Sequence, residues 1–281
     1  MKVTLWGTRG SLASAGPENV RYGGNTACVE LLGADGTLLV LDAGTGIRRL
    51  GAAMTQDVAR VDILLTHLHM DHIQGLGFFG PLYRPDLEVH VWGPPSAKMD
   101  LGSRLTKYLS PPLFPVPLRD LPCDLSVHDV PIGEEFSISG LKITAQFVCH
   151  PGATLGYRIT ENGTALAYLP DHEPALGTRE FPGVPAWTSG LSVAKGVDLL
   201  IHDAQYSDAE YPEHLGWGHS SVSQALAFAS AAGAKRLVLF HHDPGHSDAT
   251  IDRIVAEAIE CCPEPFEVVR GTEGLTLKLL G

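Results

Sequence analysis

The sequence predicts an α/β fold in which two β-sheets pack face to face between outer helices, a four-layer αββα sandwich over residues 1–281. A chain of 281 residues with 44% apolar side chains is long enough to bury one large core. β-rich runs are followed by helical patterns, and this order occurs twice along the chain. Two such halves can stack their sheets with the helices outside, which favours a single domain, although periodicity alone also permits other α+β arrangements.

The first half of the chain is predicted to be mostly strands. β-rich runs bounded by Gly, Asn or Asp predict strands at 3–6, 27–32, 38–41, 61–65 and 87–92. Helical patterns are sparse and predict helices at 45–53 and 96–108. Five prolines between Ser110 and Pro122 exclude a regular helix or a central strand, so we expect an extended covering loop, placed where it could border the active site.

The second half repeats this order. Strands are predicted at 142–148, 156–160, 165–169, 197–201 and 236–240, with a last strand at 275–279. A serine-capped, alanine-rich helix is expected at 220–232 and another helix at 249–259.

Charge and cysteine usage exclude several classes of protein. The formal net charge of −12 argues against broad electrostatic adhesion to nucleic acid or to an anionic membrane, whereas a small anionic substrate is compatible with bound divalent metals. Five cysteines without metal-site spacing predict reduced thiols in a cytoplasmic protein. We see no signal peptide and no run long enough to span a membrane. If the chain assembles with itself, a homodimer is the expected form.

A dense group of imidazoles and a carboxylate follows the predicted strand at 61–65. It contains His67, His69, Asp71 and His72. In an extended segment His67 and His69 point the same way, and a turn at 71–72 re-aims the next side chains, so one loop can serve two adjacent ions. This donor set suits zinc, and also iron or manganese. The competing interpretation is a solvated loop or helix cap that happens to be rich in histidine.

Two ions need more ligands than one loop supplies, and three residues at the ends of later strands are candidates: His150, Asp171 and His241. Each alone is more often a structural residue. His242 competes with His241, which is preferred because it directly follows the apolar strand. Asp42 is expected to cap the helix after it, a role compatible with orienting a ligand.

In chain order these residues resemble the motifs of the metallo-β-lactamase superfamily, and the resemblance covers nearly the whole chain. It implies a site for two divalent metal ions, most readily Zn²⁺, with Mn²⁺ or Fe²⁺ as alternatives. One ion would be held by His67, His69 and His150, and the other by Asp71, His72 and His241. Asp171 would bridge both ions.

Two further segments, 200–206 and 218–221, resemble the branch that contains the tRNA 3′-end-processing endonucleases and the cyclic (nucleotide) phosphodiesterases. This resemblance implies that Asp203 holds His219 beside the metals as a general acid, so Asp71, Asp203 and His219 are the expected catalytic residues. Alternatively, His219 merely precedes Ser220 as a helix N-cap. The glycine-containing segments 6–11 and 23–26 resemble the opening motifs of the same branch and predict tight turns at the edge of the site.

The expected reaction is hydrolysis of a small or cyclic phosphodiester, in which a metal-bridging hydroxide attacks phosphorus. Classical zinc β-lactamases resemble this chain less, because they carry cysteine where it has Asp171. The tRNA-processing enzymes carry an extra arm between the positions that match His150 and Asp171, and the short spacing here argues against transfer RNA. Carboxylic ester, thioester or lactone hydrolysis is the alternative on the same scaffold, and a ligand-binding or regulatory protein with little turnover is the alternative from another class.

Overall fold

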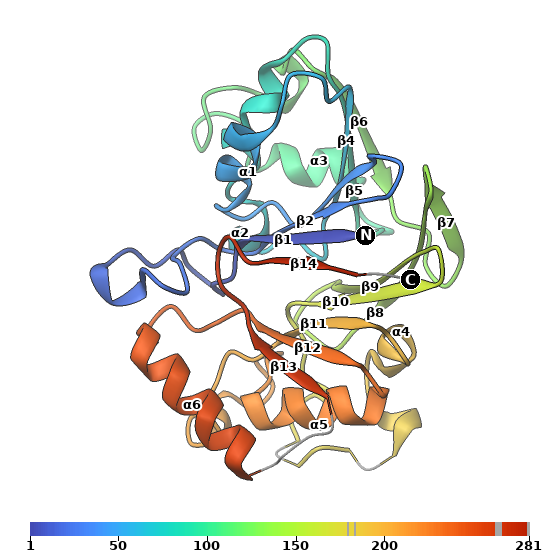
Figure 1. Ribbon diagram of the computed structural model, residues 1–281. Helices are drawn as coiled ribbons and strands as arrows, with labels where there is room; N and C mark the ends of the chain where they lie inside the picture. Colours follow the sequence, from blue (N-terminus) through green and yellow to red (C-terminus); the bar gives the residue numbers. More distant parts are fainter. Residues whose placement is uncertain (179, 183, 262–265, 280–281) are drawn as a thin grey trace.

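The computed structural model describes residues 1–281 except 179, 183, 262–265 and 280–281. Two seven-stranded sheets face each other, with helices on their outer sides (Figure 1). This arrangement is the predicted four-layer αββα sandwich.

The first sheet has the strand order β14-β1-β2-β3-β4-β5-β6. The strands from β3 to β6 run parallel, while β14, β1, β2 and β3 pair antiparallel. The C-terminal strand therefore returns to the sheet formed by the N-terminal half. The bounds of the strands are β1 (Lys2–Gly7), β2 (Cys28–Leu32), β3 (Leu38–Leu41), β4 (Arg60–Leu64), β5 (Glu88–Gly93), β6 (Asp124–Asp129) and β14 (Thr276–Lys278).

The second sheet has the order β13-β12-β11-β10-β9-β8-β7. The strands β7 to β10 form an antiparallel meander, and β10 to β13 run parallel. The bounds of the strands are β7 (Glu135–Ile138), β8 (Leu141–Phe147), β9 (Leu155–Glu161), β10 (Thr164–Leu169), β11 (Leu199–Asp203), β12 (Arg236–Phe240) and β13 (Glu267–Arg270).

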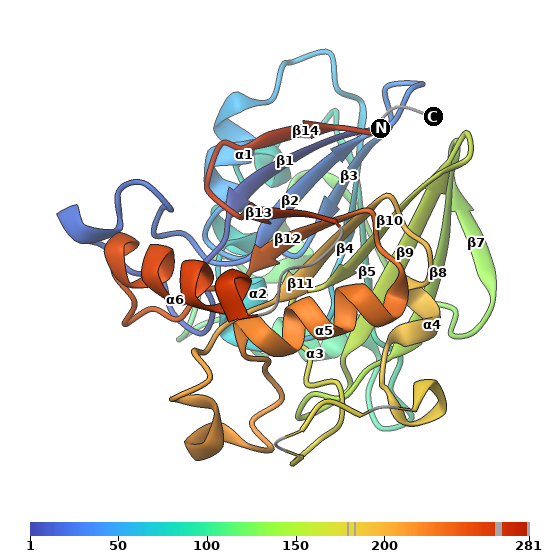
Figure 2. The ribbon, with the colours of Figure 1, turned by 60° about the horizontal axis from the view of Figure 1, so that its bottom comes forward.

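Helices cover the outer face of each sheet, and α5 and α6 lie side by side across the second one (Figure 2). The helices are α1 (Ile47–Ala53), α2 (Met70–Ile73), α3 (Leu101–Thr106), α4 (Leu191–Ala194), α5 (Val222–Ala232) and α6 (Asp248–Cys261). Strand residues alternate between layers: in β11, Leu199 and Ile201 lie in the core between the sheets, whereas Leu200 packs in the core beneath α5 and α6. Apolar side chains on both faces of a central strand explain its continuous hydrophobic run.

The predicted strands are confirmed to within one or two residues at each end, but β6, β7 and β13 were missed. Their side chains are mostly half-buried or exposed, so they lack the apolar pattern that predicts a strand. The predicted helix at 96–108 is shorter because it begins only after Asp100, whose Oδ1 accepts a hydrogen bond from the Ser103 amide at 2.8 Å. The helix predicted from Ser220 begins at Val222, and its N-cap is Ser221.

The proline-rich loop at 110–122 includes one short helical turn, Leu118–Asp120. Its Phe114 is buried against the ring of Phe78, with centroids 5.5 Å apart. Phe78 lies in the segment that follows α2, so the loop covers that segment as an extended connection.

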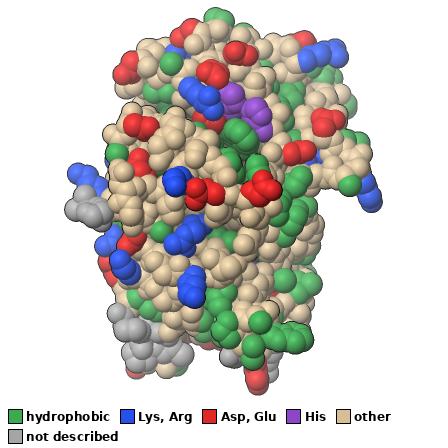
Figure 3. Space-filling view, turned by 90° about the vertical axis from the view of Figure 1, so that its right-hand side faces the viewer, with side chains coloured by type: hydrophobic (Ala, Val, Ile, Leu, Met, Phe, Trp, Pro, Cys, Tyr) green, Lys and Arg blue, Asp and Glu red, His purple; other side chains and the backbone are tan. Residues whose placement is uncertain are grey.

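The surface beside β7 carries charges of both signs. On this face Lys and Arg side chains are interspersed with Asp and Glu, and the described residues form no continuous basic patch there (Figure 3). Within the described ranges, no helix combines the length and the apolar character needed to cross a membrane.

Candidate metal centre

The loop after β4 brings the histidine cluster to one edge of the sandwich. His69 has an extended backbone and is the N-cap of α2, so the chain turns into a helix directly after it. His67 and His69 therefore precede the turn, and Asp71 and His72 lie within its first residues. This is the change from extended to turned backbone that the sequence predicted.

Two groups of side chains have ligand atoms that lie within 4.8 Å of one another. The first group is His67, His69, His150 and Asp171. The second group is Asp71, His72, Asp171 and His241. The structure thus brings together all seven residues that the sequence suggested as ligands, from four separate segments of the chain.

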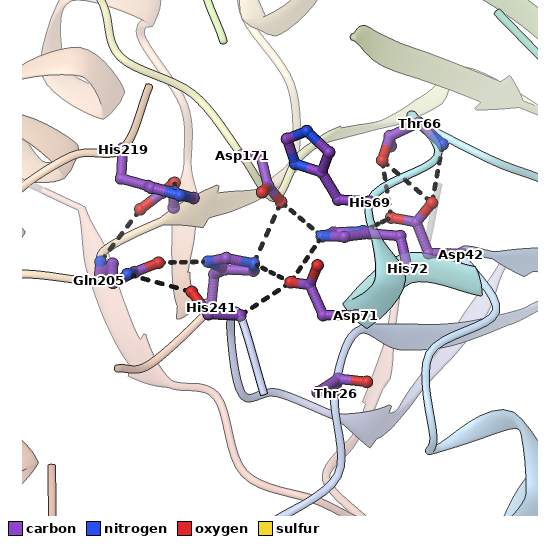
Figure 4. Close-up of polar contacts among 12 residues, drawn as sticks. Thr26, Asp42, Thr66, His69, Asp71, His72, Asp171, Gln205, His219 and His241 are labelled. Atoms are coloured by element: carbon purple, nitrogen blue, oxygen red, sulfur yellow. Dashed lines mark hydrogen bonds and ion pairs between the residues drawn. The ribbon is translucent and has the colours of Figure 1, made fainter. Parts of the chain in front are cut away.

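Asp171 belongs to both groups through different oxygens. Its Oδ2 lies 3.7 Å from His67 Nε2 and 3.6 Å from His150 Nε2. Its Oδ1 lies 2.9 Å from His72 Nε2 and 3.2 Å from His241 Nε2. A carboxylate placed in this way can bind an ion with each oxygen (Figure 4).

Several buried polar atoms of this cluster form no hydrogen bond of regular geometry. They are His67 Nε2, His72 Nε2 and Asp171 Oδ1, although the last two lie 2.9 Å apart. Buried polar atoms without partners are rare because their desolvation is not compensated. Divalent cations would satisfy them, and imidazole with carboxylate is a donor set that suits zinc. The residues present therefore fit two divalent ions.

The protonation states of His67 and Asp171 suit metal binding. Burial lowers the pKa of His67 well below its usual value, and the neighbouring imidazoles add to this effect, so its ring is neutral as a ligand must be. Burial alone would raise the pKa of Asp171, but His241 and His72 hold it well below the usual range. Asp171 therefore carries its charge inside the site.

Asp42 orients His72 and does not cap a helix, so the capping prediction was wrong. The N-cap of α1 is Gly46, with no side-chain cap. Asp42 accepts hydrogen bonds from His72 Nδ1 at 2.8 Å, from the Thr66 amide at 2.7 Å and from the Tyr168 hydroxyl at 2.9 Å. This network leaves His72 Nε2 for the second group (Figure 4).

Sequence reasoning missed other residues that orient the candidate ligands. His241 Nδ1 lies 2.9 Å from Gln205 Oε1, and His150 Nδ1 lies 2.8 Å from the Gly218 carbonyl. The Ser11 amide donates to Asp71 Oδ2 at 2.8 Å. Gln205 and Gly218 lie in motifs that the sequence singled out, but only their spatial neighbours show what they contact.

The glycine-containing segment at 6–11 lies at the edge of the site, as predicted. A Cβ added to Gly10 would lie 2.3 Å from the ring of His241, and one added to Gly24 would lie 1.9 Å from the Ser14 carbonyl oxygen. The chain can therefore approach His241 this closely only with glycine at position 10.

His242 lies outside both groups. Its Nε2 lies 2.9 Å from the Gly271 carbonyl, and its ring meets Tyr22 edge-on at 5.1 Å. Burial lowers the pKa of His242 to about 3, so it is a neutral core histidine. Of the two adjacent histidines, the structure brings only His241 to the cluster.

His219 and Asp203 form a buried pair next to the candidate ligands. His219 Nδ1 lies 2.7 Å from Asp203 Oδ2, and the ring of His219 is 4.9 Å from that of His150 and 5.0 Å from that of His241. Burial alone would lower the pKa of His219, but the Asp203 carboxylate raises it to about 9. Ser220 does not cap α5, because its hydroxyl donates to the His172 carbonyl at 2.6 Å.

Comparison with known proteins agrees with this architecture. Residues 37–242 match the model of the Beta-lactamase superfamily domain. Ribonuclease Z of Myxococcus xanthus is 26% identical, with 88% of this chain and 90% of that protein covered. The uncharacterized protein Rv1339 of Mycobacterium tuberculosis is 30% identical, with 96% and 93% covered.

Solved structures share the fold over almost their whole length. The metallo-beta-lactamase fold protein YhfI from Bacillus subtilis has a TM-score of 0.72 at 18% identity, with 99% of both chains covered. Human tRNase Z, short form, has a TM-score of 0.69 at 21% identity, with 99% of both chains covered. A diphosphatase from the PhnP family has a TM-score of 0.68 at 18% identity, with 98% of this chain and 96% of that chain covered. The protein belongs to the beta-lactamase superfamily and is a hydrolase with the metallo-β-lactamase fold.

Proposed function

We propose that the protein is a phosphodiesterase that holds two metal ions and hydrolyses a small or cyclic phosphodiester. The observation that carries this proposal is the position of the His219–Asp203 pair about 5 Å from the rings of two candidate ligands. An acidic leaving group can depart without a proton donor, whereas an alkoxide needs one. A proton donor at this position therefore favours a substrate whose leaving group is an alkoxide.

One ion would be held by His67, His69 and His150. The other ion would be held by Asp71, His72 and His241, and Asp171 would bind both ions. Zn²⁺ suits this donor set best, with Mn²⁺ or Fe²⁺ as alternatives. When bound, the two ions would supply Lewis acidity and lower the pKa of an attacking water.

His219 is the proposed general acid. Asp203 accepts from its Nδ1 and leaves Nε2 free to donate a proton. Asp203 is itself held by the Gln205 amide at 3.0 Å and the Ser220 amide at 3.2 Å. In the reaction, water adds to phosphorus and gives up one proton to solvent, and the P–O bond to the alcohol breaks. The leaving oxygen takes the proton from Nε2, and solvent returns a proton to the imidazole.

The short connection between His150 and Asp171 favours a compact substrate. It is occupied by β9 and β10, joined by a turn at Asn162 and Gly163, both of which have positive φ. No extra arm is inserted there. The net charge of −12 also favours a small anion over a polynucleotide.

Processing of transfer RNA is the second candidate, because Ribonuclease Z of Myxococcus xanthus matches 88% of this chain. On this candidate the chain would have to grip a long polyanion with its 20 basic side chains against 32 acidic ones. The two candidates share the metal ligands and differ in substrate size.

A substrate panel combined with metal analysis tests the proposal. Purified protein is analysed for metal content and assayed with cyclic nucleotides, linear dinucleotides, bis-p-nitrophenyl phosphate, lactones and a 3′-extended tRNA precursor. We expect about two ions per chain and the highest kcat/KM on a cyclic or dinucleotide diester. A preference for the tRNA precursor would favour the second candidate, and a preference for lactones would overturn both.

A further inference from the structure

A tryptophan lies exposed on the loop that leads into the general acid. The indole of Trp217 is 59% exposed, and only Gly218 separates it from His219. Exposure alone does not mark a binding site, but an exposed indole beside a candidate catalytic residue is available to pack against a bound molecule. The two residue steps from Trp217 to His219 span at most about 7 Å of chain.

The backbone on both sides of Trp217 is fixed by one buried carboxylate. Glu173 Oε1 accepts a hydrogen bond from the Gly216 amide at 3.0 Å, and its Oε2 accepts one from the Gly218 amide at 3.0 Å. Glu173 is fully buried and follows Asp171 by two residues. The loop is therefore tied to the segment that carries the shared ligand, which lowers the entropy lost when a ligand packs against Trp217.

The loop also contacts His150, one of the candidate metal ligands, directly. A Cβ added to Gly218 would lie 2.5 Å from His150 Nδ1 and 2.9 Å from His150 Cα, so the backbone adjacent to Trp217 packs against His150. The residue next to Trp217 is therefore held against His150, a member of the first group of candidate metal ligands.

A series of aromatic rings connects Trp217 with the general acid. The ring of His214 meets Trp217 at 4.9 Å and 81°, and stacks on Tyr206 at 4.2 Å and 19°. Tyr206 in turn meets the ring of His219 at 6.0 Å. Tyr206 is buried and His214 half-buried, so the series supports the indole from behind and leaves Trp217 as its solvent-exposed ring. A flat ring can pack on such an indole face.

We propose that Trp217 stacks on the nucleobase of the substrate, so that the phosphodiester is one that carries a nucleoside. This inference rests on the proposed phosphodiesterase function. In a nucleotide the ribose separates the base from the phosphate. When the phosphate lies at the candidate metal ligands, the base therefore lies some way from them. Trp217 is two residues from His219, which would protonate the leaving alcohol, so a base carried by that alcohol comes within reach of the indole. Stacking on an aromatic side chain tolerates every base, because each has a π face.

The test compares a substrate with and without a base. Trp217→Ala is expected to raise KM for 3′,5′-cyclic AMP about tenfold or more with little change in kcat, and to leave KM for the base-free 1-deoxyribose 3′,5′-cyclic phosphate unchanged. Trp217→Phe should recover part of the affinity. Trp187→Ala is the matched control, because Trp187 is 78% exposed on another segment, and it should behave as the wild type. Equal KM changes for both substrates, or none, would overturn the assignment.

A binding measurement separates this inference from the proposed function. Adenosine is titrated into the purified protein while tryptophan emission is recorded. We expect saturable quenching that Trp217→Ala abolishes and Trp187→Ala retains. If the protein hydrolyses no phosphodiester yet shows this quenching, the proposed function fails and the base-binding assignment holds. Absence of quenching in the wild type, or its persistence in Trp217→Ala, would overturn the assignment whatever the protein hydrolyses.

Discussion

The carboxylate of Asp203 lies 2.7 Å from Nδ1 of His219, between the candidate metal ligands and the loop that carries Trp217. Asp203 is fully buried and His219 is 8% exposed, so neither partner is screened by bulk water. A charged hydrogen bond in such surroundings orients the imidazole more firmly than an exposed one would. The pair is therefore built to present one nitrogen of His219 to the cluster.

Replacing His219 tests its role as general acid. His219→Ala should slow hydrolysis of an alkyl diester by roughly 100- to 10,000-fold, because the alkoxide loses its proton donor. Bis-p-nitrophenyl phosphate should be affected much less, since a nitrophenolate leaves without protonation. The measurement is kcat/KM for both diesters, and equal losses on the two would contradict the role.

The two adjacent histidines provide a matched pair for the metal assignment. His241→Ala should lower the metal content of the purified protein, because the ring belongs to the second ligand group. His242→Ala should retain the wild-type content, because its Nε2 faces the Gly271 carbonyl. Elemental analysis measures the ratio of metal to protein, and circular dichroism shows that each variant is folded. If the His242 variant loses metal and the His241 variant does not, the assignment is reversed.

Glu173 should contribute measurably to stability. In Glu173→Gln the side-chain NH₂ group would face the backbone N–H of Gly216 or Gly218, so two donors would meet. Hydrogen bonds to the charged carboxylate, which contribute about 1.5–3 kcal/mol each, would be lost. We expect a lower urea midpoint and faster proteolysis of the loop at 211–218. Tyr211→Phe is the milder control, since it removes only the hydroxyl that lies 3.0 Å from Glu173 Oε1. A Glu173→Gln protein as stable as the wild type would show that this anchor contributes nothing.

The start of the same loop should respond to pH through Glu210. Burial alone would raise the pKa of Glu210, but hydrogen bonds from Ser207 and His246 lower it to about 2. The pKa of Glu210 in the folded state lies below its value of about 4.3 in the unfolded chain. The ionised carboxylate therefore stabilises the fold at pH values above about 4.3, and this contribution disappears as the pH falls towards about 2.

The comparison is between the wild type and Glu210→Gln in urea unfolding at a series of pH values. The variant should be less stable at neutral pH, and the difference in unfolding free energy should shrink on acidification. A difference that stays constant over the whole acidic range would argue against the depressed pKa.

Local pattern alone was enough to predict much of this molecule. The alternation of buried and exposed side chains at the start of β8 and the continuous apolar run of β11 both follow from covalent geometry, which places successive side chains on opposite faces of a strand. The histidine cluster at 67–72 is local in the same sense, because the turn at Asp71 and His72 depends on neighbouring residues. The strands that escaped prediction, such as β6 and β13, carry half-buried and exposed side chains and so lack this signal.

The contacts between distant residues come from the packing of the whole fold. Asp42 and His72 meet because β3 and β4 are parallel neighbours, and no spacing in the sequence indicates that Asp42 binds a ligand and not a helix end. The packing of the two sheets likewise aims His241 at Asp171 and its neighbour His242 at a backbone carbonyl. Local sequence pattern shows which side chains are available and which of them lie at strand ends. Which of these side chains meet depends on contacts between residues far apart in the sequence, and these contacts depend on strand register and on how the two sheets stack.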